Sequence, residues 1–341
     1  MTTPYPSGTL LDTADCSTDE LEALLELASH LKSTGFRTQK AAGNMLGLLF
    51  FNSSLRTRVS FETAAVQLGA STSHIQPGSG SWPLETDFGT VMDGDKTEHV
   101  KEAVAVLSRY CDVLGVRLFA GMQDYETDLS DALMKEIVKY ADVPVLNLES
   151  GAAHPFQSLA DWLTLRELFG QDIKDKTFVL RWAPHPKPLP MAVPNSALQI
   201  AARAGMNVVL NCPEEYLLDD RFTESAENFA QEAGGNLSVV HDQDAGMQDA
   251  DVVYVKSWGA PLLYSSPDSE QKLRTTKYQN WTVDSHAMDQ TSDAKVMHCL
   301  PVRRNVVITD EVLDSKNAVH IDQAENRMHV QKAWLHQLWN I

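Results

Sequence analysis

Apolar residues recur along the chain with two different periods, and each period predicts a different kind of element. The leucines of segment 19–32 fall at helical spacing, and Ser17 or Thr18 precedes them as a candidate helix cap. Segment 46–51 is a short continuous apolar run, which is typical of a buried strand. Segment 58–68 returns to helical spacing, so we expect a strand, a polar turn and then a helix.

The same alternation continues to the end of the chain. Further strands are predicted at 72–75, 112–116, 143–147, 177–181, 207–210, 237–241, 251–256, 281–283 and 295–298. Further helices are predicted within 91–110 and at 131–140, 161–169, 195–204, 222–232 and 326–338. Short strands that alternate with helices indicate parallel sheets covered on both faces, which is an α/β fold.

Two such arrays lie on either side of about residue 150. A chain of 341 residues also exceeds the length at which one core usually divides, roughly 250–300 residues. We therefore predict two doubly wound parallel-sheet domains, 1–150 and 151–321, with a cleft between them. Terminal helices would link the lobes, and the last one, 322–341, would pack back on the first domain. Ligands of such sheets bind beyond the carboxyl ends of the strands.

Composition restricts the partners of the protein. The formal net charge is -18, which disfavours nucleic acids and anionic lipid surfaces as partners. No apolar run approaches the ~18–20 residues that cross a bilayer, and segment 1–15 lacks the pattern of a secretory signal. The four cysteines form no CxxC pair, so we expect a reduced, cytoplasmic protein without structural zinc. An anionic substrate would need a local basic cluster to overcome the global charge.

Segment 51–62, FNSSLRTRVSFE, could provide such a cluster where a strand turns into a helix. Backbone N–H groups at the start of a helix and the helix dipole favour an anion there. Ser54, Arg56 and Thr57 would add charge-assisted hydrogen bonds, although the segment lacks the GxxxxGK[ST] pattern of nucleotide-binding loops. The alternative is a polar helix cap with a solvated arginine pair, and the spacing alone leaves both interpretations open.

Two further motifs follow along the chain. HPFQ at 154–157 precedes a predicted helix, and HCLP at 298–301 closes a predicted strand. SxRTRxSFE, HPxQ and HCLP in this order resemble the pattern of the aspartate/ornithine carbamoyltransferase family, from the first helix to the last. The resemblance implies transfer of a carbamoyl group from carbamoyl phosphate, with no cofactor and no metal. It also implies a donor-binding first domain and an acceptor-binding second domain.

Other segments indicate which subgroup of the family the chain resembles. Lys256-Ser257-Trp258-Gly259 stands where ornithine carbamoyltransferases carry an SMG loop, and 81–85, 91–95, 182–188 and 301–305 read SWPLE, VMDGD, WAPHPKP and PVRRN. These segments resemble the N-acetylornithine and N-succinylornithine carbamoyltransferases. That subgroup acts on N2-acylated ornithine in arginine biosynthesis, so an N2-acylated ornithine is the implied acceptor.

Two positions bear on the acyl group. By resemblance, the N-acetyl enzymes have a glutamate where Thr97 stands and a lysine where Val307 stands, whereas the N-succinyl enzymes have a proline at the first position. Succinyl adds a carboxylate, so loss of an anion from the pocket rim favours it. We therefore predict N2-succinyl-L-ornithine as the acceptor, giving N2-succinyl-L-citrulline and phosphate, with N2-acetyl-L-ornithine as the alternative. Thr97 departs from both patterns.

The resemblance also assigns individual residues. It implies that carbamoyl phosphate contacts Ser54, Leu55, Arg56, Thr57, Trp82, Arg117, His154, Gln157, Cys299, Leu300 and Arg327. The catalytic residues among them would be Arg56, Arg117, His154 and Cys299, the last through its backbone carbonyl and not as a thiolate. The acylornithine would contact Glu149, His185, Lys256, Leu300 and Arg303. Trp82 would reach the site of a neighbouring subunit, which implies a homotrimer.

Several alternatives remain at the level of sequence. Glu149 could be a solvated strand end and His185 a simple turn residue, while Asp93, Asp95 and Glu98 resemble a metal site but are better explained as shaping a loop. A dinucleotide-dependent oxidoreductase is disfavoured because no GxGxxG follows a predicted strand. A non-catalytic relative is disfavoured because the three motifs keep Arg56, Thr57, Arg117, His154 and Gln157.

Overall fold

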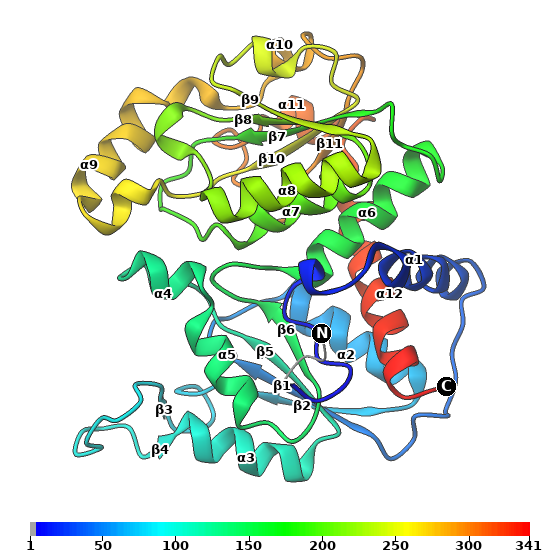
Figure 1. The fold of residues 1–341 in the computed structure, drawn as a ribbon, viewed down its shortest axis with the longest axis vertical. Coiled ribbons are helices and arrows are strands. Elements are labelled where there is room, and N and C mark those ends of the chain that lie inside the picture. The colour runs from blue at the N-terminus through cyan, green and yellow to red at the C-terminus, as the bar shows by residue number, and fades with distance from the viewer. Residues whose placement is uncertain (1–4) are drawn as a thin grey trace. The chain divides into compact units, whose positions relative to one another are not determined.

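The computed structural model describes residues 5–341, and the chain divides into two compact units (Figure 1). Unit 1 comprises the described residues up to Gly121 together with Glu126–Phe156 and Arg327–Ile341. Unit 2 comprises Met122–Tyr125 and Gln157–Asn326. The division falls within α6 (Pro155–Phe169) and α12 (His320–Leu338), so each of them contributes to both units, and it also separates Tyr125 from the rest of α4 (Tyr125–Leu129).

Unit 1 is built on a parallel sheet with the strand order β2-β1-β5-β6. The strands are β1 (Met45–Phe50), β2 (Ser71–Ile75), β5 (Val113–Arg117) and β6 (Val145–Glu149). In the register of the sheet, Arg117 lies beside Phe50 on one side and beside Glu149 on the other. The carboxyl ends of three neighbouring strands are therefore level, which brings the segments that follow them together.

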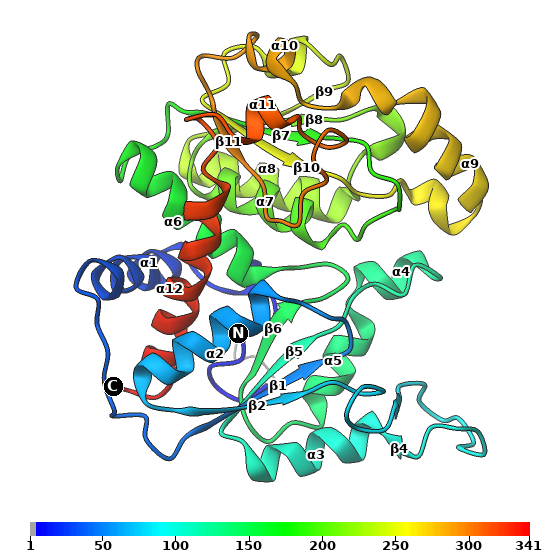
Figure 2. The same ribbon diagram turned by 180° about the vertical axis from the view of Figure 1, so that it is seen from behind.

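Helices cover both faces of this sheet, with α2 on one face and α3 and α5 on the other (Figures 1 and 2). The apolar faces of α3 and α5 pack on β1, β5 and β6 in one buried cluster. The helices are α1 (Thr18–Ser33), α2 (Arg56–Leu68), α3 (Val100–Tyr110), α4 (Tyr125–Leu129) and α5 (Ala132–Lys139). The predicted cap of the first helix is confirmed, because Ser17 and Glu20 form a capping box.

Between β2 and α3 the chain forms an extension that carries the small pair β3 (Leu84–Glu85) and β4 (Glu98–His99). Figure 1 shows this segment projecting beside α3. It exposes several large apolar side chains, namely Trp82, Phe88, Val91 and Met92. The sequence pattern did not predict β3 and β4, because strands of two residues leave no recognisable period.

Unit 2 contains the second parallel sheet, in the order β11-β10-β7-β8-β9. Its strands are β7 (Thr177–Trp182), β8 (Asn207–Asn211), β9 (Asn236–Val240), β10 (Val252–Lys256) and β11 (Lys295–Met297). Its helices are α7 (Ala192–Arg203), α8 (Asp220–Ala233), α9 (Pro267–Lys272), α10 (Ser285–Met288) and α11 (Asp310–Leu313). The predicted α/β fold with two parallel sheets is thus confirmed.

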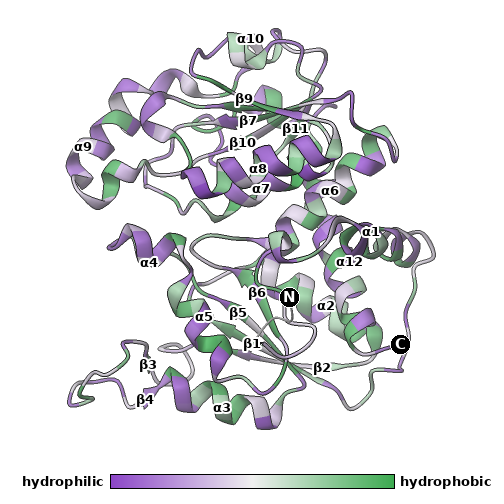
Figure 3. Ribbon diagram, in the orientation of Figure 1, coloured by the Kyte–Doolittle hydropathy of each residue, from purple (hydrophilic) through white to green (hydrophobic). Residues whose placement is uncertain are grey.

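Helices α7 and α8 cover one face of this sheet, and α10 and α11 pack on the other through a buried apolar cluster (Figures 1 and 2). In Figure 3 the strands are largely hydrophobic, whereas α8 carries many hydrophilic residues. Short helical turns complete the chain at Thr13–Asp15, Glu214–Tyr216, Ala245–Met247, Pro261–Tyr264, Leu273–Lys277 and Gln279–Trp281.

The strand predicted at 281–283 is wrong. Trp281 ends a 3-10 turn, closed by its N–H donating to the Tyr278 carbonyl, and Val283 makes only an isolated bridge to Ile308. The Trp281 ring lies under the buried guanidinium of Arg181, 4.1 Å from the ring centroid. That long-range cation–π contact holds the buried Trp281 ring without any strand at this position.

Within the described part of the chain, no helix is both long and apolar enough to span a bilayer. Among residues 5–341, no group of three or more His, Cys, Asp or Glu side chains could hold a metal ion.

Candidate active site

The turn between β1 and α2 is held by side-chain hydrogen bonds at the carboxyl edge of the first sheet. Ser54 Oγ accepts from the Thr57 N–H at 3.2 Å, and Asn52 Oδ1 accepts from the Phe119 N–H at 2.8 Å. The second bond joins this turn to the segment that follows β5. Ser54 and Arg56 are half-buried, and Leu55 between them is exposed. The helix start predicted to bind an anion is thus fixed in place and accessible.

The Thr57 hydroxyl accepts hydrogen bonds from two arginines that lie far away in the sequence. Its Oγ1 accepts from Arg327 Nη2 at 2.6 Å and lies 3.4 Å from Arg117 Nη1, which also donates to it. All three side chains are buried, with exposures of 1%, 3% and 7% for Thr57, Arg327 and Arg117. Strand β5 and helix α12 therefore bring two cationic donors to the Thr57 hydroxyl of α2.

A carboxylate partly balances this charge. Glu149, at the end of β6, accepts from Arg117 Nη1 at 2.6 Å, and His154 Nε2 lies 3.3 Å from the same oxygen of Glu149. His154 Nε2 is also 3.5 Å from Arg327 Nη2. The structure thus places Glu149 with the donor-side residues of unit 1, whereas the other residues predicted for the acceptor lie in unit 2.

Arg117 keeps an unused donor in this arrangement. Its Nε is buried and has no hydrogen-bond partner among residues 5–341. A buried donor of this kind costs free energy unless a ligand or water satisfies it. Together with the guanidinium of Arg327, it makes this cluster suitable for a compact anion with several oxygens.

Trp82 and Thr97 lie on the β3–β4 extension and apart from this cluster. Trp82 is 57% exposed, and its indole N–H donates to Glu98. Thr97 directly precedes β4 and is exposed. Neither side chain is buried, so both are accessible to another molecule.

In unit 2, His185, Lys256 and Arg303 gather at the carboxyl ends of β7 and β10. Arg303 Nε donates to His185 Nε2 at 3.0 Å, and Lys256 Nζ donates to the Ser257 carbonyl at 2.9 Å. Burial lowers the pKa of His185, and the charges of Arg303, Lys256 and Arg274 lower it further. His185 is therefore neutral at pH 7 and accepts from Arg303. Among residues 5–341, neither Lys256 nor Arg303 pairs with a carboxylate.

The loops after β7 and β10 are joined to each other. Ser257 Oγ donates to the Pro184 carbonyl at 3.3 Å, and the Gly259 N–H donates to the Leu189 carbonyl at 3.0 Å. Trp182 and Trp258 are fully buried beneath these loops, and the Trp182 indole donates to the Trp258 carbonyl at 3.0 Å. This packing gives Lys256 a rigid support.

The HCLP turn also belongs to unit 2. Leu300 has a positive φ of 57°, and its N–H donates to His298 Nδ1 at 2.8 Å. Cys299 is half-buried. Gln157 lies near the start of α6, at 1% exposure. Val307 is buried in the apolar cluster beneath α10 and α11, so its side chain packs in the core.

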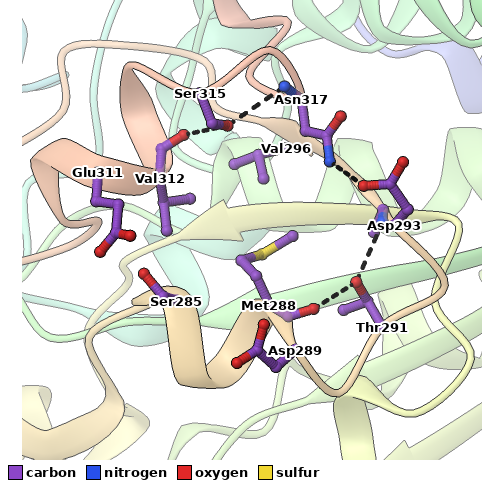
Figure 4. Close-up of a pocket in the computed structure, with 11 residues that line it drawn as sticks. Ser285, Met288, Asp289, Thr291, Asp293, Val296, Glu311, Val312, Ser315 and Asn317 are labelled. Atoms are coloured by element: carbon purple, nitrogen blue, oxygen red, sulfur yellow. Dashed lines mark hydrogen bonds between the residues drawn. The ribbon is translucent and has the colours of Figure 1, made fainter.

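A separate hollow of about 240 Å³ lies between α10, α11 and the edge strand β11 (Figure 4). Apolar side chains such as Met288 and Val296 form part of its lining, and Asp289, Asp293 and Glu311 contribute carboxylates. None of the predicted site residues lines it. It is therefore distinct from the residues discussed above.

Sequence reasoning missed two residues that hold the site. Arg274 is buried, pairs with Glu270 at 3.0 Å, and donates to the His185 carbonyl at 2.6 Å. Asp161, in α6, accepts from Gln157 Nε2 at 2.8 Å. Arg274 belongs to a π-helical turn without any motif, so no sequence signal indicated it. The signal for Asp161 was its position four residues after Gln157, which places both on one helix face.

Comparisons with known proteins agree with this arrangement. The carbamoyl-P binding domain of aspartate/ornithine carbamoyltransferase matches residues 9–167, and its Asp/Orn binding domain matches residues 191–338. N-acetylornithine carbamoyltransferase of Xanthomonas axonopodis pv. citri (strain 306) is 48% identical over 325 residues, which are 95% of this chain and 94% of that protein. N-succinylornithine carbamoyltransferase of Bacteroides fragilis (strain 638R) is 38% identical over 309 residues, 90% of this chain and 92% of that protein.

A solved structure of a related protein matches the fold of this chain over almost its whole length. It is a glutamate-to-proline mutant of N-acetyl-L-ornithine transcarbamylase complexed with carbamyl phosphate and N-succinyl-L-norvaline. It superposes with a TM-score of 0.93 at 47% identity and covers 97% of this chain and 99% of its own. Both family domains and whole-length relatives match, so the chain belongs to the aspartate/ornithine carbamoyltransferase family.

Proposed function

We propose that this carbamoyltransferase moves the carbamoyl group of carbamoyl phosphate to the side-chain amine of N2-acetyl-L-ornithine, giving N2-acetyl-L-citrulline and phosphate. The observation that carries the proposal is the 48% identity to an N-acetylornithine carbamoyltransferase over 95% of the chain, against 38% to an N-succinyl enzyme. This reverses the order predicted from Thr97 and Val307, because whole-chain similarity favours the acetyl acceptor.

Unit 1 would hold the donor. The first turn of α2, with Ser54, Leu55, Arg56 and Thr57, offers N–H groups, hydroxyls and a guanidinium to the phosphate. Arg117 would also contact the phosphate. Together with His154 it would donate to the carbamoyl oxygen, where negative charge grows as the amine attacks. One such donor typically lowers the barrier by about 3–4 kcal/mol.

Unit 2 would hold the acceptor. Lys256 and Arg303 are cations without a carboxylate partner in the described chain, so they suit the α-carboxylate of an N2-acylated ornithine. Acylation removes the charge of the α-amine, so no carboxylate is needed beside them. The HCLP turn would orient the amines through the carbonyls of Cys299 and Leu300.

The reaction balances without a protein base. The side-chain amine, with a pKa near 10.4 in water, must attack in its neutral form, and nearby cations favour that form. Its nitrogen bonds to the carbamoyl carbon, the bond from that carbon to the phosphate oxygen breaks, and the departing phosphate accepts the proton released by the nitrogen. Alignment of the two bound molecules would supply much of the acceleration.

N2-succinyl-L-ornithine is the second candidate, and a specific residue favours it. Thr97 leaves the extension uncharged at the position where, by resemblance, N-acetyl enzymes carry a glutamate. The glutamate-to-proline mutant of an N-acetyl enzyme was crystallised with an N-succinyl compound, which supports an effect of such a glutamate on the acyl group.

The acceptor can be tested with the purified protein, carbamoyl phosphate and three acceptors in parallel: ornithine, N-acetylornithine and N-succinylornithine. We expect the highest kcat/KM with N-acetylornithine, read as acylcitrulline formation. A higher value with N-succinylornithine would select the second candidate, and a preference for free ornithine would refute acylated acceptors altogether. Thr97→Glu should increase the preference for N-acetylornithine, whereas an unchanged ratio would remove Thr97 from the argument.

We further propose a homotrimer in which Trp82 of one subunit completes the donor site of the next. The exposed indole and the apolar residues of its extension support this assignment. Trp82→Ala and Arg117→Ala would each inactivate the protein alone. Mixed after dissociation and reassembly, they should regain activity, because some sites then contain both native residues. Mixtures as inactive as the separate variants would refute sharing.

A further inference from the structure

The buried carboxylate of Asp161 joins two amide side chains. It lies in α6 and is 1% exposed. Gln157 Nε2 donates to its Oδ1 at 2.8 Å, and Gln323 Nε2, from α12, donates to the same oxygen at 2.7 Å. Both glutamines are buried as deeply, at 1% and 0% exposure. All three residues belong to unit 2.

This contact determines which way the Gln157 amide points. The amide has a donating and an accepting end, and a carboxylate can only accept. Turning the amide over would place its oxygen against the charged oxygen of Asp161, so that orientation is disfavoured. The free end is therefore Oε1, which is buried and has no hydrogen-bond partner among residues 5–341. An acceptor left in this state costs about 1–3 kcal/mol, which a ligand N–H would recover.

The second glutamine extends the network to the HCLP turn. Gln323 Oε1 accepts from the His298 N–H at 2.9 Å, so the same carboxylate sets the orientation of this amide too. His298 Nδ1 in turn accepts from the Leu300 N–H at 2.8 Å. Leu300 has the positive φ that disfavours most side chains, so the turn needs such support.

We propose that Asp161 is a positioning residue for carbamoyl transfer. It presents Gln157 Oε1 as an acceptor for the carbamoyl NH2 group and, through Gln323 and His298, holds the backbone of Cys299 and Leu300. This inference rests on the proposed function and adds a residue to it. The alternative is that Asp161 only fastens α6 to α12, which would affect stability alone.

Asp161→Asn is the most informative substitution. Asparagine has nearly the same volume, but its amide can donate as well as accept, so either glutamine can turn over. Misplacing a reacting group by about 1 Å can cost a factor of ~100, so we expect kcat to fall by roughly 10–100-fold. Inhibition by inorganic phosphate should be unchanged, because the predicted phosphate contacts at Ser54–Thr57 are not part of the network.

Thr164→Val provides a matched control. Thr164 lies one turn further along α6, is also 1% exposed, and its Oγ1 accepts from Asn326 Nδ2 of α12 at 2.9 Å. The substitution removes a buried bond between the same two helices without touching the network. We expect it to lower the melting temperature but to keep kcat. If Asp161→Asn and Thr164→Val had equal effects on kcat, Asp161 would be structural and the proposal refuted.

A mutant cycle tests the route of the effect. In a protein that already carries Gln157→Ala and Gln323→Ala, Asp161→Asn should cause no further loss of kcat, because residues acting through one another are not additive. A full additional loss would mean that Asp161 acts otherwise, which overturns the proposal. A wild-type protein that forms no acylcitrulline would instead refute the proposed function itself, so the two failures can be told apart.

Discussion

Glu149 is the residue whose replacement tests the donor site most sharply. Its carboxylate pairs with Arg117 at 2.6 Å, and the two side chains are only 13% and 8% exposed. A phosphate that needs Arg117 must compete with this carboxylate and is repelled by it. We predict that Glu149→Gln makes the protein less stable and at the same time raises its affinity for inorganic phosphate.

The magnitude follows from the burial of the pair. Removing one partner of a buried ion pair costs about 3–5 kcal/mol, and glutamine keeps an oxygen near Arg117, so we expect about 3 kcal/mol. For a domain of roughly 150–250 residues this lowers the melting temperature by about 6–12 °C. Relief of the repulsion should tighten phosphate binding roughly tenfold, which corresponds to about 1.4 kcal/mol.

The assay is thermal unfolding with and without phosphate. A ligand at 100 times its dissociation constant stabilises by about 2.7 kcal/mol, so saturating phosphate should recover most of the deficit. Asp142→Asn is the control, because it removes the same charge from an exposed pair with Arg109, where we expect a change of about 1 kcal/mol or less. If Glu149→Gln behaved like this control and bound phosphate no more tightly, the assignment of Glu149 as a competitor would fail.

Three further outcomes follow from the charges of the structure. Burial raises the pKa of Asp131 to about 6. The stability contributed by its protonated form is therefore fully present below the unfolded value of 3.8 and is lost as the pH rises to about 6. Across that range the free energy of unfolding of the wild type, measured in urea titrations, should fall by about 3 kcal/mol relative to that of Asp131→Asn. Lys256→Met should raise the acceptor KM at least roughly tenfold, for a lost charge-assisted bond of about 1.5–3 kcal/mol, while the exposed Lys187→Met should not. Arg303 is exposed and Lys256 is buried, so the effect of Arg303→Met on this KM should shrink in high salt and that of Lys256→Met should persist; equal salt dependence would contradict this difference.

The sequence predicted the elements that carry a period and the segments that carry motifs. The leucines of α1 and the apolar runs of the central strands report directly on burial, which is why these elements were found. The motifs placed Ser54–Thr57 and His154 at element ends, and the structure agrees with that placement. The 3-10 turn at Trp281 was missed, because its burial depends on Arg181, 100 positions away in another element.

Partners of charged residues could not be predicted in this way. Thr57 and Arg327 are 270 positions apart and meet only because α12 returns to unit 1. Glu149 was predicted to contact the acceptor, and its pairing with Arg117, which follows from the register of β5 and β6, was not predicted. A local pattern shows that a side chain lies at the end of a strand, whereas its partner depends on the order of strands in the sheet.

The net charge of -18 is compatible with the binding of anionic substrates because both described units keep cations at their predicted sites. The two units differ in whether a carboxylate neutralises those cations. In unit 1, Arg117 is buried and partly neutralised by Glu149, so the donor must replace one anion by another. In unit 2, the exposed Arg303 donates to a neutral His185, and Lys256 donates only to a carbonyl, so their charges remain available. A dianion can displace a single carboxylate from an arginine, whereas a monoanionic acceptor is attracted more weakly and would not displace it. The absence of a counter-carboxylate beside Lys256 and Arg303, among residues 5–341, is therefore what an acceptor with one α-carboxylate requires.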